Sequence, residues 1–319
     1  MSESVNTKYP KVSVIVASYN SESRSELKRC LESVKCQDYK GELEILVLDG
    51  GSIDKSVEIS ISLGARVINN SMVTELGFNG GKNLGVSNAS GELIAIVDAD
   101  NILMNSDYLT QMVQPFMDDE QVSMTVPMPY VPFPKESTDL CRYFCFMERR
   151  LWEDLASFGI AVGSWIKFSP LEIVVSNGAL IRRSTLNKIG GWDYDTEVGY
   201  RLIKNGFNIF GLVKSAERFH IEILNYEDVW RKYKRRIFNQ IEERNHKKIS
   251  QTKIDNQIRN PFLFLRNELL RPFKSIPKKN KKYYYITIRL FLIKVILGLQ
   301  YIFISRKYTS RNLNSKVRA

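Results

Sequence analysis

Residues 93–100 read Leu-Ile-Ala-Ile-Val-Asp-Ala-Asp, and this stretch decides the fold. Its apolar run predicts a buried β-strand that stops at two carboxylates, Asp98 and Asp100. Charged groups are costly inside a protein core unless something compensates them. Two acids at the end of a buried strand therefore indicate a divalent cation and, with it, a phosphate ligand. The alternative is a pair of solvated acids in a turn, and the neighbouring segments decide between the two.

The segments before this strand alternate between strand and helix patterns, which predicts a mostly parallel sheet. Ligands of such sheets bind outside the carboxyl ends of the strands. Polar residues follow three of the predicted strands, at Asn20, Asp49 and Asp98, so we expect them at one edge. The expected strands are residues 12–17, 43–48, 65–68 and 93–98.

Three helices are expected between these strands. Ser52 or Asp54 could cap the second helix, and a glycine-bearing loop at 76–81 is expected to lead into the third. The expected helices, with their apolar positions, are 25–36 (Leu27, Leu31, Val34), a helix that follows a cap at Ser52 or Asp54 (Ile53, Val57, Ile61) and one near 81–89.

A nucleotide fits the expected edge. Gly50 and Gly51 let the backbone approach a ligand closely, and Asp49 could accept a hydrogen bond from a base or a ribose hydroxyl. An aspartate before two glycines also commonly forms a turn, and that alternative stays open. The sequence has no GxGxxG or GxxxxGK[ST] pattern, which argues against a dinucleotide oxidoreductase and a P-loop NTPase.

An ordered series of motifs resembles the family 2 inverting glycosyltransferases. The resemblance runs from about residue 11 to 220, and it implies an α/β GT-A fold: a Rossmann-like, mostly parallel sheet flanked by helices. The motifs are residues 12–20 (Val-Ser-Val-Ile-Val-Ala-Ser-Tyr-Asn), 48–54 (Leu-Asp-Gly-Gly-Ser-Ile-Asp), 83–85 (Asn-Leu-Gly) with 90–92 (Ser-Gly-Glu), and 98–100 (Asp-Ala-Asp).

The resemblance also implies the parts of a donor site. Asp100 would ligate Mg²⁺ or Mn²⁺, and Asp98 would touch the ribose or the metal. His220 is a further metal-ligand candidate that would favour Mn²⁺, although a lone histidine is more often structural. The residues expected to bind the nucleotide sugar are Ala17, Tyr19, Asn20, Glu22, Asp49, Asn83 and Asp98.

Residues 176–206 resemble the acceptor motif of the family and suggest a catalytic base. Asp195 takes the base position, with Asp193 as the second choice, because the usual Glu-Asp pair reads Tyr-Asp at 194–195. The base would take a proton from the acceptor hydroxyl, a step that an already ionised polyprenyl phosphate would not need. Both aspartates could instead cap the helix expected over 194–204.

Residues 120–175 fit the family least. Four prolines between 127 and 134 predict an extended segment. A helix is expected next, with Leu140, Phe144, Met147, Leu151 and Leu155 on one face. Acceptor candidates there are Glu148, Arg149, Arg150 and Trp152, with a packed helix bearing solvated charges as the alternative.

Charge divides the chain into two regions. The whole chain carries +11, but residues 231–319 hold 24 basic and 4 acidic residues, a net +20, which leaves −9 for residues 1–230. Such asymmetry indicates contact between the basic region and an anionic surface. We therefore expect a glycosyltransferase domain over 1–230, with a donor half at 11–100 and an acceptor half at 101–230, and a basic, mainly helical extension over 231–319.

The apolar run at 283–304 follows a lysine cluster at 278–282 and contains Arg289 and Lys294. A charge near a bilayer centre costs about 2.5–3.5 kcal/mol, so a helix lying in the membrane interface is favoured over a single span or a packed soluble helix. With no recognisable signal peptide and four cysteines without zinc spacing, a peripheral position on the cytoplasmic face of a membrane is expected.

The resemblance, together with the charge pattern, implies a metal-assisted inverting transferase that moves a sugar from a nucleotide-diphosphate sugar to a lipid-linked or cell-surface glycan. The alternatives are a nucleotidyltransferase of similar fold and a non-enzymatic binder of membranes or nucleic acid. A nucleotidyltransferase would usually have a glycine-rich loop after the first strand, and this sequence has none after the strand at 12–17. A non-enzymatic binder would not explain the clustered carboxylates. We expect no nucleic-acid partner.

Overall fold

The computed structural model describes most of the chain and divides it into two compact units. Unit 1 comprises residues 1–133 and 151–221, and unit 2 comprises residues 134–150 and 222–319. The described residues are 9–22, 26–70, 73–129, 137–169, 177–192, 195–220, 225–234, 270–278 and 280–296.

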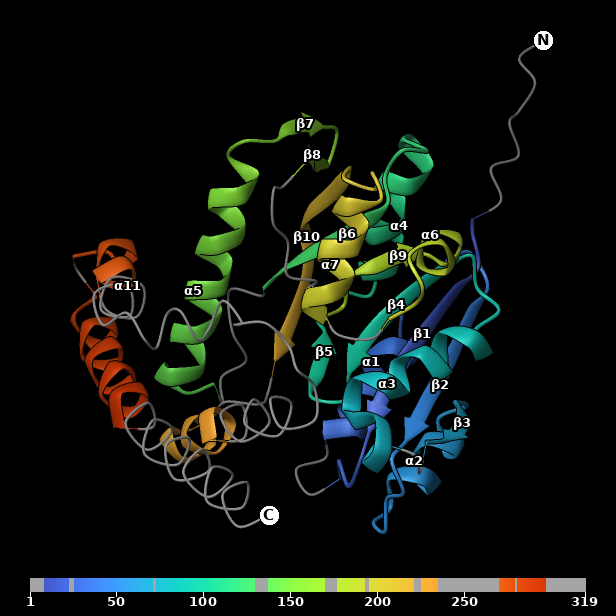
Figure 1. The fold of residues 1–319 in the computed structure, drawn as a ribbon, viewed down its shortest axis with the longest axis horizontal. Helices are drawn as coiled ribbons and strands as arrows, with labels where there is room; N and C mark the ends of the chain where they lie inside the picture. The colour runs from blue at the N-terminus through green and yellow to red at the C-terminus, as the bar shows by residue number, and fades with distance from the viewer. Residues whose placement is uncertain are drawn as a thin grey trace, which may run out of the picture. The chain divides into compact units, whose positions relative to one another are not determined.

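Unit 1 is built on one mixed β-sheet, drawn in Figure 1. Its described strands are β1 (Val12–Ser18), β2 (Leu43–Asp49), β3 (Arg66–Asn69), β4 (Leu93–Asp98), β5 (Asn101–Leu103), β6 (Met124–Pro129), β7 (Ile160–Val162), β8 (Trp165–Phe168), β9 (Leu180–Arg182) and β10 (Phe210–His220). The strand order is β3-β2-β1-β4-β9-β6-β10-β8-β7, and β5 pairs with β10. The four predicted strands form the parallel part β3-β2-β1-β4, and β9 joins β4 in the antiparallel direction.

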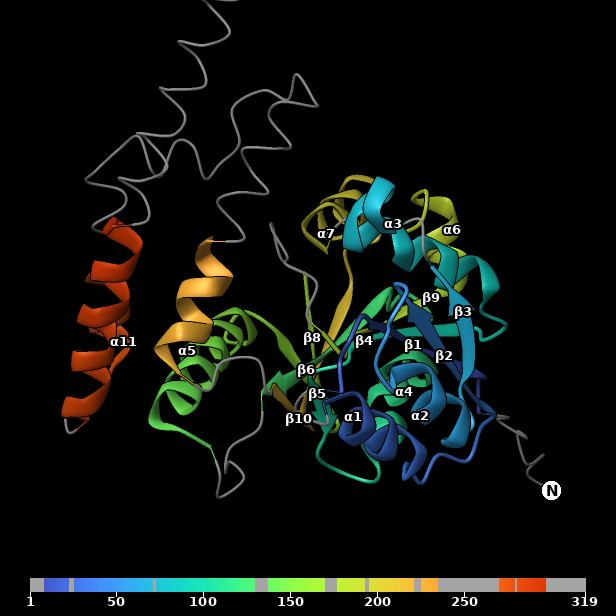
Figure 2. The ribbon, with the colours of Figure 1, turned by 90° about the horizontal axis from the view of Figure 1, so that it is seen from below.

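Helices cover both faces of this sheet, as Figure 2 shows: α1, α2 and α4 lie on one face and α3, α6 and α7 on the other. The helices of unit 1 are α1 (Glu26–Lys35), α2 (Ser56–Ser62), α3 (Val73–Asn88), α4 (Tyr108–Asp118), α6 (Arg183–Lys188) and α7 (Asp195–Lys204). The predicted helices at 25–36 and 194–204 are thus confirmed to within a residue, and Pro127 and Pro129 lie in the extended strand β6.

The core forms two layers because strand side chains alternate between the two faces. In β1, Val14 and Val16 pack with α1 and α4, whereas Ile15 packs on the opposite face. In β4, Ala95 and Val97 belong to the first layer and Ile96 to the second. Burial on both faces explains why these strands read as continuous apolar runs rather than as alternating patterns.

The third predicted helix begins earlier than expected. The glycine-bearing stretch at 76–81 is helical and belongs to α3, so the prediction of a loop there is wrong. Glycine lowers helix propensity, but tertiary packing can override it. At Gly85, a Cβ atom would lie 2.7 Å from Ile15 Cγ2, so the absence of a side chain lets α3 approach β1 closely.

The apolar stripe predicted for the second helix is also wrong. Ile53 lies before α2 and is 94% exposed, and Ile61 is 62% exposed. The buried residues of α2 are Ser56 and Ser60, and the Ser60 hydroxyl donates to the Ser56 carbonyl at 2.7 Å. Small polar residues that bond their own helix backbone can be buried without a large apolar group, which periodicity alone does not reveal.

Unit 2 is helical in its described part. It contains the start of α5 (Asp139–Ala156), helices over 226–234 and 281–296, and α11 (Arg271–Ser275). Leu140 and Tyr143 of α5 pack with Val229, Ile286 and Leu290. The packing of Phe144 and Met147 against the same cluster agrees with the predicted apolar face of α5. The division between the units falls inside α5, and the boundary expected at residue 230 stays a prediction.

Among the described residues, no helix is long and apolar enough to cross a membrane. Residues 297–304, which complete the apolar run of the sequence, lie outside the described residues.

Candidate functional site

The register of the parallel strands brings three predicted site residues to one edge of the sheet. Ser18 pairs with Asp49 across β1 and β2, and Ala17 pairs with Asp98 across β1 and β4. All three strands therefore end at the same level. The expectation that the polar strand ends meet at one edge is confirmed for Asp49 and Asp98, and Asn20 follows two residues after β1 ends.

Asp49 organises the glycine turn that follows β2. Its buried carboxylate accepts hydrogen bonds from the backbone N–H groups of Gly51 and Ser52, each at 3.1 Å. Gly51 has φ +89°, a conformation that favours glycine. The turn-forming role foreseen for Asp49 is therefore present. A carboxylate has about four acceptor positions, so these bonds leave room for a ligand on the same group.

The loops after β1 and β2 are bonded into one surface. The Asn20 backbone N–H donates to Ser52 Oγ at 2.9 Å, and Asn20 Oδ1 accepts from the Ile53 N–H at 2.9 Å. Asn20 has φ 48°, which asparagine tolerates better than most residues. Tyr19 beside it is 51% exposed. Two crossed bonds hold the loops in register and leave an aromatic ring at the edge.

Glu22 and Asp54 extend this network. The Glu22 N–H donates to Asp54 Oδ2 at 3.1 Å, and Glu22 Oε1 accepts from the Lys28 N–H in α1 at 2.9 Å. Burial acts to raise the pKa of Asp54, but hydrogen bonds from Ser56 and Glu22 outweigh it and hold that pKa below its ordinary value. Glu22 thus carries a helix-capping bond at the position where the sequence predicted a donor contact.

Asp98 is held by two residues that sequence reasoning did not select. The Asn177 side chain accepts from the Asp98 backbone N–H at 2.8 Å, and its amide N–H₂ donates to Asp98 Oδ2. Lys82 Nζ lies 3.7 Å from Asp98 Oδ1. A carboxylate held on both oxygens has a fixed direction, although its side chain is still 41% exposed.

Lys82 is a cation enclosed by the fold. The residue is only 6% exposed, and its ammonium group lies 5.8 Å from the centre of the Trp192 ring. The next residue, Asn83, accepts a hydrogen bond from the Trp192 backbone N–H, so α3 is fixed to the turn at 190–191. Asn83 was predicted to bind the donor. In the structure its side-chain oxygen accepts from Trp192, and this bond positions the turn before α7.

Asp100 and His220 meet although 120 residues separate them. His220 Nε2 lies 3.0 Å from Asp100 Oδ2, and the other carboxylate oxygen accepts from Asn101 Nδ2 at 2.7 Å. Buried Arg218 donates to Asn101 Oδ1 at 3.0 Å. β10 and β5 pair in the antiparallel direction and place His220 opposite Asn101. We call Asp49, Lys82, Asp98, Asp100 and His220 the strand-end site.

The acceptor-side predictions are only partly covered by the described residues. Asp195 is the first residue of α7, and Asp193 lies outside the described residues. The turn before them is well defined, with Gly190 and Gly191 at φ +85° and +88°. Trp152 packs against Phe168 in the core with ring centroids 6.5 Å apart, so the packed alternative holds for this acceptor candidate.

Lys82, Asn177 and Arg218 are the residues that sequence reasoning missed. Lys82 stands directly before the Asn-Leu-Gly motif, so its neighbourhood was a usable signal. Asn177 precedes Gly178, whose φ of +79° and bond to the Ile96 carbonyl at 2.8 Å form a sharp turn beside β4. No local pattern links 177 to 98, because their contact depends on the order of strands in the sheet.

The model of the family described as glycosyl transferase family 2 matches residues 13–174. This chain belongs to glycosyl transferase family 2. The family 2 domain thus covers half of the chain and includes the strand ends that hold Asp49, Asp98 and Asp100. Family membership and the helix-covered sheet confirm the expected GT-A fold, and they set aside the nucleotidyltransferase alternative.

Several curated relatives carry glycosyltransferase names. The chain is 27% identical to a probable glycosyltransferase, YdaM, of Bacillus subtilis, over 63% of this chain and 48% of that protein. It is 29% identical to glycosyltransferase GlyG of Streptococcus pneumoniae, over 56% of this chain and 58% of that protein. The family 2 chain spans about half the length of the curated relatives it matches.

Among solved structures, the crystal structure of TarS from S. aureus is similar over 86% of this chain and 47% of that one, with 18% identity and a TM-score of 0.46.

Proposed function

We propose that this family 2 chain is an inverting glycosyltransferase that moves a sugar from a nucleotide-diphosphate sugar to a hydroxyl or phosphate of a glycan or lipid-linked acceptor. One observation carries the proposal: Asp98 and Asp100 lie at the carboxyl end of β4 in the family 2 domain, and His220, which ends β10 of the same sheet, lies 3.0 Å from Asp100. Ligands of open α/β sheets bind at such ends. Lys82 adds a buried cation to the same place.

The bonded loops after β1 and β2 are suited to hold the nucleoside. Exposed Tyr19 can stack on a base, and Asp49 can accept from a base N–H or a ribose hydroxyl with its remaining lone pairs. Asn20 and Glu22 keep these groups at fixed positions through their own bonds. Preformed loops reduce the ordering that donor binding would otherwise require.

A divalent cation fits Asp100 and His220. Within the described parts of the chain, no three His, Cys, Asp or Glu side chains gather as a complete metal site. Mg²⁺ is often bound in proteins through one or two carboxylates together with substrate phosphates. Asp100 would supply an oxygen ligand and His220 a nitrogen ligand, with Asp98 as a further candidate. When bound, the ion neutralises charge on the leaving diphosphate.

Asp195 is proposed as the general base. It begins α7, four residues after Gly191 of the turn that is bonded to Asn83 of α3. The carboxylate would take the proton of the acceptor hydroxyl while that oxygen attacks the anomeric carbon and the bond to the nucleoside diphosphate breaks. A single displacement of this kind inverts the anomeric configuration. Toward a polyprenyl phosphate, whose oxygen is already ionised, Asp195 would position the acceptor instead.

The basic region 231–319 is proposed to hold the protein at the cytoplasmic face of a membrane as a peripheral protein. Its net charge of +20 favours an anionic lipid surface, which is where a lipid-linked or cell-surface acceptor would be extended. Nucleic acid is a less suitable partner, because the preceding 230 residues carry a net −9.

Donor hydrolysis across UDP-, GDP- and dTDP-sugars, with and without Mn²⁺, tests this function. We expect hydrolysis of one nucleotide class, stimulated by Mn²⁺, and a loss of about a thousandfold in Asp100→Asn, because metal stabilisation of the leaving group is worth several kcal/mol. Asp38→Asn, a change of the same type at an exposed loop position, is the control. Absence of hydrolysis with every donor would count against the function, and full activity of Asp100→Asn would count against the metal site.

A further inference from the structure

The helix over 281–296 in unit 2 carries apolar side chains on two opposite sides. Ile286 and Leu290 are buried against Leu140, Tyr143 and Val229. A second set is between 43% and 57% exposed and recurs at intervals of three and four residues, which is the spacing of one helical face. These residues are Tyr285, Ile288, Leu292 and Ile296, and we call them the exposed stripe.

Cations border the exposed stripe. Lys281 lies one turn before Tyr285, and Lys282 and Arg289 lie along its side. Residues 270–296 contain no aspartate or glutamate, so no acidic side chain of this segment interrupts the positive border. A solvated helix face normally carries both signs of charge, whereas an apolar face with a basic border is typical of helices that lie on anionic lipid.

Arg289 and Lys294, the two cations inside the apolar run, are compatible with a helix whose exposed stripe lies on lipid. The Arg289 guanidinium lies 5.1 Å from the Tyr226 ring centre and 4.6 Å from that of Tyr285. Lys294 lies 4.9 Å from the Tyr233 ring. Both charges therefore lie on aromatic rings of unit 2, where cation–π contact stabilises them.

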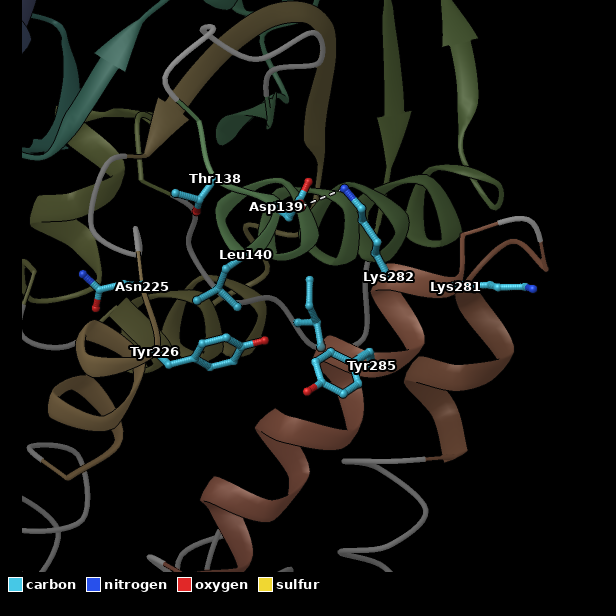
Figure 3. Close-up of a pocket in the computed structure, with 9 residues that line it drawn as sticks. Thr138, Asp139, Leu140, Asn225, Tyr226, Lys281, Lys282 and Tyr285 are labelled. Carbon is cyan, nitrogen blue, oxygen red and sulfur yellow. Dashed lines mark hydrogen bonds and ion pairs between the residues drawn. The ribbon is translucent and has the colours of Figure 1, made fainter.

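A pocket of about 640 Å³ adjoins the start of the stripe. Figure 3 shows Tyr226 and Tyr285 at this pocket, with Lys282 reaching Asp139 and Lys281 pointing away from that carboxylate. The Lys282–Asp139 ion pair measures 3.1 Å, and both side chains are more than half exposed. The pocket therefore gives one end of the stripe the lysine and tyrosine groups that suit a lipid headgroup.

We propose that the exposed stripe docks unit 2 on an anionic lipid bilayer, with Ile288, Leu292 and Ile296 among the acyl chains and Lys281 and Lys282 at the phosphate level. This inference rests on the membrane association proposed above and names the surface that performs it. A bilayer fits better than a protein partner because the stripe is narrow, continuous along the helix and accompanied by Lys281 at its start and by Lys282 and Arg289 along one side.

Sedimentation of the full chain with vesicles tests the proposal, with phosphatidylcholine vesicles compared to vesicles that also contain phosphatidylglycerol. We expect binding only with phosphatidylglycerol, weakened by salt. Ile288→Ser with Leu292→Ser should lower the binding constant by more than about tenfold. Lys281→Gln with Lys282→Gln should lower it by about 25-fold, since each cation near such a surface contributes about fivefold.

Matched controls change similar residues in unit 1. Ile61→Ser removes an apolar side chain that is 62% exposed, and Lys40→Gln with Lys214→Gln removes two exposed charges. These variants should bind vesicles as the unchanged protein does. Unfolding curves of all variants should coincide, because every altered side chain is exposed.

Equal vesicle binding by the stripe variant and the unchanged protein would overturn the proposal. So would a stripe variant that turns a dimer into a monomer and keeps its vesicle binding, since the stripe would then be a protein interface. Donor hydrolysis measured in solution on the same samples separates this proposal from the enzymatic one. Hydrolysis without stripe-dependent binding defeats only the docking surface, and binding without hydrolysis defeats only the enzymatic function.

Discussion

The strand-end site of unit 1 and the exposed stripe of unit 2 both gather charged groups, but they do so in opposite ways. The strand-end site joins residues that are as far apart in sequence as Asp100 and His220, and strand order fixes their positions. The stripe and its border come from one helix and follow from its periodicity alone. In the strand-end site, the order of strands fixes the position of each side chain. In the exposed stripe, the binding free energy is shared among several side chains of one helix.

The comparison predicts that single substitutions act strongly in unit 1 and weakly in unit 2. The largest effect is expected at Asp195. Asp195→Asn should lower kcat for a hydroxyl acceptor by about 10²–10⁴, because the amide cannot take the proton of the attacking oxygen. Steady-state transfer assays measure this, with Asp38→Asn as the control. A turnover within about tenfold of the unchanged protein would show that Asp195 is not the base.

Glu44 offers the next largest effect, on stability rather than on catalysis. Its carboxylate accepts from the Ser13 hydroxyl and from the N–H and hydroxyl of Ser90 at 2.9 Å, and it thereby joins β1, β2 and the turn before β4. Glu44→Ala should lower the free energy of unfolding at pH 7 by about 2–3 kcal/mol, because the buried Ser13 hydroxyl loses a charged acceptor and the link to Ser90 is lost. Denaturant titration of the variant and of Glu42→Ala measures the difference.

The same residue has a pH signature. Burial acts to raise the Glu44 pKa, but hydrogen bonds from Ser13 and Ser90 outweigh it and hold the pKa below its ordinary value of 4.5. Because the unfolded state binds the proton more readily, the stabilisation is present above pH 4.5 and is lost as pH falls through the folded value. The difference in the free energy of unfolding between the unchanged protein and Glu44→Gln should therefore become smaller as the pH falls below 4.5. A difference that grows in acid would contradict this explanation.

A smaller effect is expected at Lys82. Lys82→Met should weaken donor binding by about tenfold, since the change removes one charge-assisted contact beside Asp98 and keeps the apolar stem near Trp192. Lys82→Arg keeps the charge and should bind more tightly than Lys82→Met. Titration calorimetry with the nucleoside diphosphate measures both. Equal affinities of Lys82→Met and Lys82→Arg would show that the charge of Lys82 does not contribute to donor binding.

The smallest effect belongs to unit 2. Arg289→Met should lower the free energy of unfolding by about 0.5–1 kcal/mol, the usual size of a cation–π contact at an exposed site. Lys28→Met, a loss of charge at an exposed position of α1, is the comparison. A loss of several kcal/mol in Arg289→Met would contradict the view that unit 2 spreads its charge effects over many residues.

The sequence predicted the donor half of the fold because local signals and tertiary structure agree there. The apolar runs of β1, β2 and β4 are buried on both faces, and each stops at a polar residue that the parallel register brings to one edge. The candidate site was found for the same reason: Asp49 and Asp98 mark strand ends. Strand ends can be read from a sequence without knowledge of any contact.

The parts that escaped prediction depend on contacts between distant segments. Asn177 reaches Asp98 only because β9 lies beside β4, and Lys82 reaches it only because Gly85 lets α3 approach the sheet. The error at α2 has another cause. Ile53 and Ile61 suggested an apolar face directed at the core. The face of α2 that is buried instead carries Ser56 and Ser60, and the Ser60 hydroxyl bonds to the Ser56 carbonyl of the same helix.

The position of β9 has a consequence for the order in which the protein is made. This three-residue strand lies in the middle of the sheet, and the asparagine that holds Asp98 stands just before it. All residues of β1, β2 and β4 have been synthesised once the chain reaches residue 98, but the amide partner of Asp98 follows 79 residues later. A nascent chain arrested between residues 98 and 177 would lack the side chain that holds Asp98. The proposed donor site would therefore be completed only late in synthesis.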